Sequence, residues 1–202
     1  IFTACELFGD YGNGRNGYGS CDLFYAAKDG KNWTNPVNLG TTINTNHWET
    51  QPSYSADGKT LFFIRGIRDR SGNRQGDIYT SELTKDSYWT KPIKLNRNIN
   101  TGLNEESVFI HPDGQTLYFA SNGHPGMGGL DIYITRRMEN GEWGLPINIG
   151  YPINTFKNEI LRKSNVTSVT MTNDIPGNSL VMFGNVRKTE DERAQKVSSN
   201  FM

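Results

Sequence analysis

A tryptophan phrase recurs three times along the 202-residue chain, at intervals of 56 and 54 residues. The three copies are Trp33-Thr34-Asn35-Pro36-Val37-Asn38-Leu39, Trp89-Thr90-Lys91-Pro92-Ile93-Lys94-Leu95 and Trp143-Gly144-Leu145-Pro146-Ile147-Asn148-Ile149. A fixed period of roughly 55 residues is typical of architectures in which each copy is one supersecondary unit packed against its neighbours. We therefore expect the core to be built from stacked units rather than from one continuous layer.

Three further phrases recur in the same order as the tryptophan phrase. An Ile-Asn-Thr phrase is followed in each copy by a glutamate, at Glu49, Glu105 and Glu159. An Asp-Gly pair separates two apolar runs, at Asp57-Gly58 and Asp113-Gly114. An aspartate opens an apolar and aromatic run, at Asp22, Asp77 and Asp131. Four phrases in one order define a repeated structural unit.

The phrases predict four antiparallel strands in each unit. Asp-Gly between apolar runs is a strong hairpin signal, because the tight turn needs a positive φ that glycine adopts without steric cost. We expect Gln51–Ser55 to pair with Thr60–Arg65, and Ser107–His111 with Thr116–Ser121. The aspartate runs supply a third strand, and the Trp-x-x-Pro phrase an outer edge strand where a missing N–H is tolerated. Such a unit is one blade, so the predicted fold class is an all-β propeller.

The repeats divide the chain into blades. Residues 1–40 make a partial first blade, 48–95 a second, 104–149 a third, and 158–202 a degenerate fourth without the tryptophan phrase. About four blades allow either a small closed ring or, as we favour, a segment of a larger ring. The run Thr189-Glu190-Asp191-Glu192 reads as a capping box and predicts a short helix over Glu190–Val197.

Composition excludes several classes of function. Lys+Arg and Asp+Glu both total 21, so there is no basic excess and we expect no nucleic-acid partner. Apolar runs are too short to span a bilayer, so no transmembrane segment is expected. The chain opens at Ile1 without a signal peptide, and we expect it to be a mature or excised segment of a longer protein.

The run from Glu105 to Tyr133 carries a family resemblance. It resembles the TolB-like, WD-type β-propeller repeats of Bacteroidetes cell-envelope proteins, and most closely the propeller of OmpA-family proteins; the resemblance covers about residues 20–160. It implies a periplasmic, outer-membrane-associated scaffold that binds envelope or secretion-system proteins, and peptidoglycan through a domain outside this chain. One similar branch is the PorE-type component of type IX secretion, which implies a role in protein transport.

Cys5 and Cys21 are the only cysteines. They are expected to face each other across an antiparallel pair, at the base of a Gly-rich insertion over Glu6–Ser20. A disulfide there would close a loop of about 15 residues, which the chain-entropy model values at roughly 3 kcal/mol. The alternative is a pair of buried free thiols, as in a cytosolic protein.

The repeated acids have two interpretations. Glu49, Glu105 and Glu159 could ring a central channel and bind a cation, or accept hydrogen bonds from the preceding Asn-Thr turn and hold one blade to the next. We favour the structural role, and we read the three repeated aspartates as caps at strand starts. The Gly-rich loops Gly9–Gly19, Gly66–Gly76 and Gly123–Gly129 lack calcium-loop spacing, so we predict no metal and no cofactor.

Enzymatic activity is not expected, and no catalytic residue is assigned. Asp29-Gly30-Lys31-Asn32-Trp33 resembles the Asp-box hairpin of sialidase propellers, so the alternative function is a glycan-binding or glycan-hydrolysing propeller. The histidines His47, His111 and His124 have no metal-ligand spacing. The aromatic residues Trp48, Tyr88 and Phe156 are candidate partner contacts on the blade connections. For Trp48, packing between blades is an equal alternative.

Overall fold

The computed structural model describes the whole chain except residues 7–10, 13, 69–73, 155–180, 187–194 and 201–202. Every regular element in the described part is a β-strand, so the predicted all-β class is confirmed. The strands are β1 (Phe2–Cys5), β2 (Cys21–Tyr25), β3 (Lys28–Asp29), β4 (Asn32–Trp33), β5 (Val37–Asn38), β6 (Trp48–Tyr54), β7 (Thr60–Arg68), β8 (Arg74–Glu82), β9 (Ile93–Lys94), β10 (Glu105–Ile110), β11 (Thr116–Ser121), β12 (Asp131–Arg136), β13 (Ile147–Asn148), β14 (Val181–Val186) and β15 (Gln195–Asn200).

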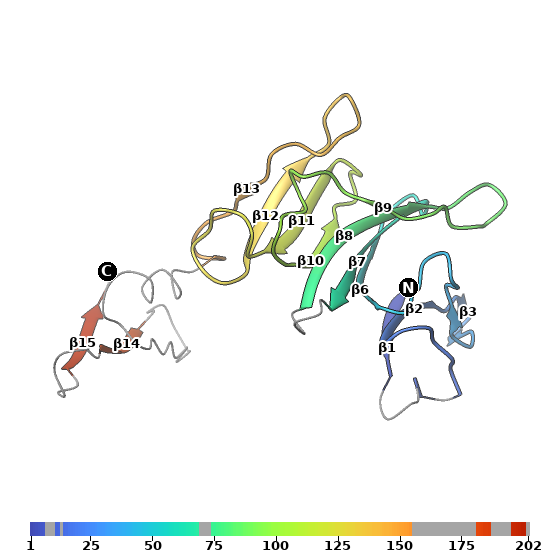
Figure 1. Ribbon diagram of the computed structural model, residues 1–202, viewed down its shortest axis with the longest axis horizontal. Helices are drawn as coiled ribbons and strands as arrows, with labels where there is room; N and C mark the ends of the chain where they lie inside the picture. Colours follow the sequence, from blue (N-terminus) through green and yellow to red (C-terminus); the bar gives the residue numbers. More distant parts are fainter. Residues whose placement is uncertain (7–10, 13, 69–73, 155–180, 187–194, 201–202) are drawn as a thin grey trace. The chain divides into compact units, whose positions relative to one another are not determined.

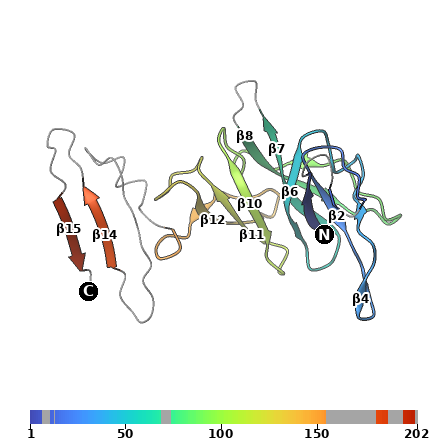
Figure 2. The ribbon, with the colours of Figure 1, turned by 90° about the horizontal axis from the view of Figure 1, so that it is seen from below.

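The chain divides into two compact units, which are described separately. The first comprises Ile1–Pro125 and Ile132–Ile149, and the second Gly126–Asp131 and Gly150–Met202. In the second unit, β14 and β15 pair antiparallel over six residues (Figure 2). The helix predicted over Glu190–Val197 is therefore wrong at Gln195–Val197, which lie in β15. A capping box is a local preference of about 1 kcal/mol, and a cross-strand hydrogen-bond ladder outweighs it.

Two antiparallel sheets of the same strand order form most of the first unit (Figure 1). One runs β6-β7-β8-β9 and the other β10-β11-β12-β13. The hairpins predicted around the two Asp-Gly pairs are confirmed as β6–β7 and β10–β11. The N-terminal strands β1, β2 and β5 extend the first of these sheets, because a single parallel bridge joins Cys21 to Trp48. The sequence repeats predicted separate blades, and this bridge links the first two.

The hairpin turns are fixed by the Asp-Gly pairs. Gly58 and Gly114 have φ of +70° and +65°, in the left-handed region that other residues rarely adopt. The Asp113 carboxylate accepts hydrogen bonds from the Thr116 hydroxyl and from the backbone N–H groups of Gln115 and Thr116. These bonds, the hydroxyl first, lower the pKa of Asp113 below its ordinary value. Each Asp-Gly pair is thus a self-contained turn.

The outer strand of each sequence repeat is shorter than predicted. Only the two residues after the proline pair as β5, β9 and β13. Before the proline, Trp89 and Trp143 each make an isolated bridge, to Leu83 and Arg137. Proline lacks the N–H that a continuous ladder needs, so it divides the phrase into a bridge and a short strand.

Strand β7 is buried on both faces. Its run from Leu61 to Ile64 is at most 4% exposed. Phe62 and Ile64 enter a core cluster with β10–β12 residues such as Phe119 and Tyr133, whereas Leu61 and Phe63 enter a second cluster with Leu23 and Ile43. Because side chains alternate along a strand, the β6–β9 sheet packs against a neighbour on each face.

The three repeat tryptophans lie in different environments. Trp143 is 5% exposed and contacts Phe62 of the preceding sheet edge to face, with ring centroids 6.0 Å apart. Trp89 packs on the cluster that contains Leu23. Trp33, in the β3–β4 hairpin, is 69% exposed. Trp89 and Trp143 each pack on the sheet that precedes their own in the sequence. Among the described residues, Trp33 has no preceding sheet to pack on.

Candidate functional site

The repeated glutamates bind the turn that precedes them. Glu49 and Glu105 are fully buried. Glu49 accepts hydrogen bonds from the N–H and the hydroxyl of Thr45, at 3.0 and 2.7 Å. Glu105 accepts the equivalent pair from Thr101, at 3.2 and 2.8 Å. The third glutamate, Glu159, lies outside the described residues. Both described carboxylates therefore close a connection between sheets.

The asparagine of the Ile-Asn-Thr phrase joins the same connection to the preceding sheet. The Asn44 carboxamide accepts a bond from the Leu23 N–H and donates one to the Leu23 carbonyl, at 2.8 and 2.9 Å. Asn100 does the same with Ile78, at 2.7 and 2.9 Å. A buried carboxamide that pairs with both backbone groups of one residue substitutes for a neighbouring strand. This explains why asparagine occupies the position.

The two glutamates differ in their third partner. Arg65 lies opposite Glu49, and its Nε is 2.9 Å from Glu49 Oε1. Ser121 lies opposite Glu105 and donates a hydroxyl bond of 2.8 Å to Oε1. Burial raises the pKa of Glu105, and the bonds from Ser121 and Thr101 only partly oppose that shift. Arg65 and Ser121 were not singled out by the sequence, because the repeat does not preserve this position.

Arg65 and His124 fill equivalent space from non-equivalent positions. The Arg65 guanidinium lies 4.8 Å from the Tyr79 ring centroid and donates to the Ile43 carbonyl at 2.7 Å. The His124 ring lies 5.1 Å from the Tyr133 centroid, and its Nε2 is 3.0 Å from the Ile99 carbonyl. Both side chains cover the third-strand aromatic ring and contact the carbonyl of the Ile-Asn-Thr phrase. The structure thus gives His124 a packing role.

The repeated aspartates hold the Gly-rich loops. Asp22 is fully buried and accepts bonds from the N–H groups of Tyr18 and Gly19, and from the Asn38 carboxamide. Asp131, in the second unit, accepts bonds from the N–H groups of Met127 and Gly128.

Asp77 has a different partner. Its Oδ2 is 2.7 Å from Lys94 Nζ, and its buried Oδ1 has no hydrogen bond in the described part of the chain. Its loop, Gly66–Gly76, includes residues 69–73 that lie outside the description.

Cys5 and Cys21 form a disulfide between β1 and β2. The two residues are direct partners in the antiparallel register. The bridge sits at the end of the pair, next to the hydrogen bond from the Glu6 N–H to the Ser20 carbonyl. It ties the two ends of the insertion together at one point, as expected of a staple at its base.

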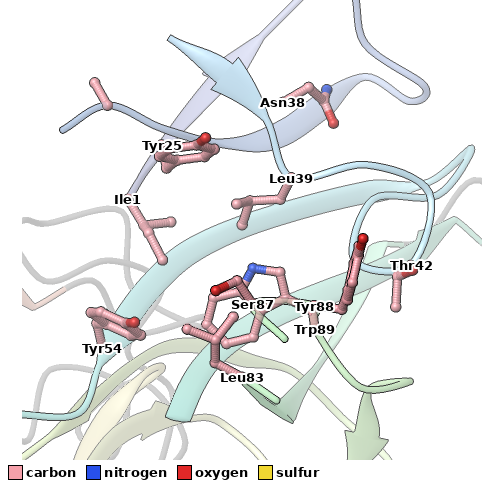
Figure 3. Close-up of a pocket in the computed structure, with 11 residues that line it drawn as sticks. Ile1, Tyr25, Asn38, Leu39, Thr42, Tyr54, Leu83, Ser87, Tyr88 and Trp89 are labelled. Atoms are coloured by element: carbon pink, nitrogen blue, oxygen red, sulfur yellow. The ribbon is translucent and has the colours of Figure 1, made fainter. Parts of the chain in front are cut away.

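An aromatic groove lies between the N-terminal strands and the β6–β9 sheet, with a volume of about 530 Å³. We call it the tyrosine groove. Its first wall is formed by Ile1, Tyr25, Leu39 and Thr42, and its second by Tyr54, Leu83, Ser87, Tyr88 and Trp89 (Figure 3). Tyr25, Tyr54 and Tyr88 are 43%, 42% and 72% exposed, so their rings are open to a ligand. The volume falls in the range of small-molecule and peptide-binding pockets.

Two repeat positions differ between the groove and the next junction. At the junction of the second and third sheets, the carboxamides of Asn96 and Asn98 each donate a 2.9 Å bond to the Trp143 carbonyl. At the first junction the corresponding residues are Gly40 and Thr42. Within the described chain, no side chain donates a hydrogen bond to the Trp89 carbonyl.

A strained turn presents Tyr88 to the groove. Ser87 has φ of +64°, at the position where the next repeat has Gly141 with φ of +82°. The turn is closed by a bond from the Thr84 N–H to the Tyr88 carbonyl. A serine in the left-handed region costs on the order of 1–3 kcal/mol, and such outliers cluster at ligand-binding sites. Comparison of the repeats position by position would have identified this turn.

The other predicted contact residues are not in the groove. Trp48 is half-buried, packs against the core cluster, and lies so close to Gly66 that a Cβ there would come within 1.8 Å of the indole. The structure thus places Trp48 in packing between sheets. Phe156 lies outside the described residues. The Asp-box-like segment is the β3–β4 hairpin, with Gly30 at φ +58°.

The described residues contain no group of three or more His, Cys, Asp or Glu side chains arranged to hold a metal ion. They also contain no helix with the length and apolarity needed to cross a membrane.

Taken together, the described part is all-β, and its first unit holds an aromatic groove between the N-terminal strands and the β6–β9 strands. No protein-family model and no curated protein matches the sequence. Among solved structures, the crystal structure of TolB from Acinetobacter baumannii is similar with a TM-score of 0.29 and 12% sequence identity. The match covers 91% of this chain and 47% of that one, so the chain spans about half the length of the structure it resembles.

Proposed function

We propose that the sheets are blades of a β-propeller that acts as a non-catalytic protein-binding scaffold. The blades are residues 1–40, 48–95 and 104–149, with a degenerate fourth over 158–202. The observation that carries the proposal is the double-sided burial of β7, which lies between two neighbouring sheets as a propeller strand does.

The use of the repeat residues supports a scaffold. Asn44, Glu49, Asn100 and Glu105 are buried and bonded to the backbone or to a side chain of a neighbouring turn. These residues make the stack rigid, and a rigid stack presents its connecting loops in fixed positions. The conspicuous polar residues of the repeat thus serve the stack, and the exposed aromatic residues remain for contact with partners.

The cellular setting is part of the proposal. The Cys5–Cys21 disulfide suits an oxidising compartment, and we place the protein in the periplasm, associated with the outer membrane. Its partners are envelope or secretion-system proteins, including those of type IX secretion. Peptidoglycan is reached through a domain outside this chain.

The test is fractionation with cross-linking of the natural full-length protein, tagged and expressed in its own organism. We expect outer-membrane fractions to contain the protein with Cys5 and Cys21 oxidised, cross-linked reproducibly to defined envelope proteins. A tagged envelope protein of similar abundance is the control. Recovery in the cytosol with both thiols free, or the same cross-links from the control, would overturn the proposal. If the protein hydrolyses a glycan and replacing one acidic residue abolishes that activity, the glycan-active alternative takes its place.

A further inference from the structure

We propose that the tyrosine groove binds an extended, proline-rich segment of a partner protein. This inference rests on the proposed scaffold function and names the kind of ligand that one of its sites takes. It starts from the chemistry of the groove walls, which combine three exposed tyrosines with a tryptophan and carry no charged side chain. A ligand that fits such walls is uncharged and has flat apolar faces.

The free aromatic hydroxyl and indole groups of the groove can all donate hydrogen bonds. In the described part of the chain, the hydroxyl groups of Tyr25 and Tyr88 and the indole N–H of Trp89 have no hydrogen-bond partner. Tyr54 differs, because its hydroxyl donates to the Gly58 carbonyl. Polyproline segments offer backbone carbonyls as acceptors and have no N–H at proline, so they complement a surface that supplies hydroxyl and indole donors.

The aromatic spacing suits the same ligand. Proline-rich segments adopt the extended polyproline II helix, whose rings dock between aromatic side chains at little cost in conformational entropy. Tyr54 and Trp89 form an edge-to-face pair on the second wall, with centroids 6.0 Å apart. Tyr25 lies across the groove on the first wall, so a docked segment has aromatic rings on both sides (Figure 3).

A neutral saccharide is the competing ligand, and the groove fits it less well. Sugar hydroxyls are usually bound by carboxylate and carboxamide side chains, which accept and donate in fixed directions. Asn38 also lines the groove and is its only carboxamide. Its Nδ2 donates to the Asp22 carboxylate and its Oδ1 accepts from the Gly40 N–H and from Asn44. The one amide of the groove is therefore already engaged.

The experiment is titration of the full chain with fluorescently labelled decaproline, followed by anisotropy. A Gly-Ser decamer and a neutral hexasaccharide are the comparison ligands. We expect saturable binding of decaproline alone. Tyr88→Ser should weaken it about tenfold, as expected for an exposed aromatic anchor. Thr42→Asn introduces the carboxamide that the second junction has at this position and should weaken it about fivefold or more. Trp33→Ser, which removes an equally exposed aromatic ring outside the groove, should change the affinity less than about twofold.

Several results would overturn the inference. The first is that decaproline does not bind at about 1 mM. The second is that Tyr88→Ser leaves the affinity for decaproline unchanged. The third is that the saccharide binds and the peptide does not. Thermal unfolding of each variant checks its folding, since Tyr88 and Thr42 are exposed. If envelope partners are still captured while decaproline fails to bind, the scaffold function stands and only the ligand is wrong. If decaproline binds and no envelope partner is captured, the scaffold function fails and the groove stands.

Discussion

Replacing Arg65 with methionine tests the buried ion pair between β6 and β7 at the first junction. Glu49 is fully buried, and the Arg65 side chain is 14% exposed with its Nε 2.9 Å from the carboxylate. At an effective dielectric constant of about 20, two charges at that distance attract by about 6 kcal/mol. Methionine keeps an unbranched apolar stem against Tyr79 and removes the charge. The carboxylate of Glu49 is then left buried without its cation.

The expected cost of Arg65→Met is about 3–5 kcal/mol at pH 7, the usual penalty for removing one member of a buried pair. The lost bond to the Ile43 carbonyl and the lost contact with the Tyr79 ring are part of this change. The free energy of unfolding of an ordinary domain is about 5–15 kcal/mol, so the variant should be folded but clearly destabilised.

The assay is urea unfolding followed by tryptophan fluorescence, on four proteins that form a double-mutant cycle. They are the wild type, Arg65→Met, Glu49→Gln and the double variant. We expect the double variant to be about 1–3 kcal/mol more stable than Arg65→Met, because it no longer contains an unpaired buried charge. A cost below about 1 kcal/mol for Arg65→Met, or additive effects in the cycle, would refute this account of the junction.

Three further predictions follow from the same structure. Trp143→Ala should cost about 3–5 kcal/mol in a urea melt and Trp33→Ala less than about 0.5, since only Trp143 is buried; equal costs would mean that Trp33 is covered in solution. Replacing both Cys5 and Cys21 with alanine should cost about 3 kcal/mol, and reductant should lower the melting temperature of the wild type but not of the variant. A raised pKa at Glu105 means that the folded chain holds this proton more tightly than the unfolded chain, whose value is near 4.5. Its contribution is therefore full below that pH and is lost as the pH rises through the folded pKa, so the stability of wild type relative to Glu105→Gln should fall as the pH rises above about 4.5. A difference that grows with pH would contradict the assignment.

The strand pattern of each unit was accessible from the sequence because its signals are local. The Asp57-Gly58 and Asp113-Gly114 pairs mark turns through backbone geometry that two or three residues determine. Alternation of apolar residues marks the strands, and repetition at a fixed interval confirms each assignment independently. The helix predicted over Glu190–Val197, which is wrong at Gln195–Val197, was also a local signal, but a single one that no repeat supported.

What the repeats could not reveal is how one sheet meets the next. Arg65 and His124 perform one role from different places in the repeat, and only their common contacts with a tyrosine ring and an isoleucine carbonyl show it. The environment of a side chain at a junction depends on residues about 50 positions away, and no local pattern encodes that.

The sequence by itself determined the all-β class, the strand order within a unit and the positions of the Asn-Thr-Glu connections. The tertiary structure decided that Trp143 is buried while Trp33 is exposed, and that the first junction holds a groove. The physical reason is that burial and cavities are properties of two surfaces in contact. The effect of Gly40 and Thr42 on the groove depends on Tyr88 and its neighbours, which face them from the other wall.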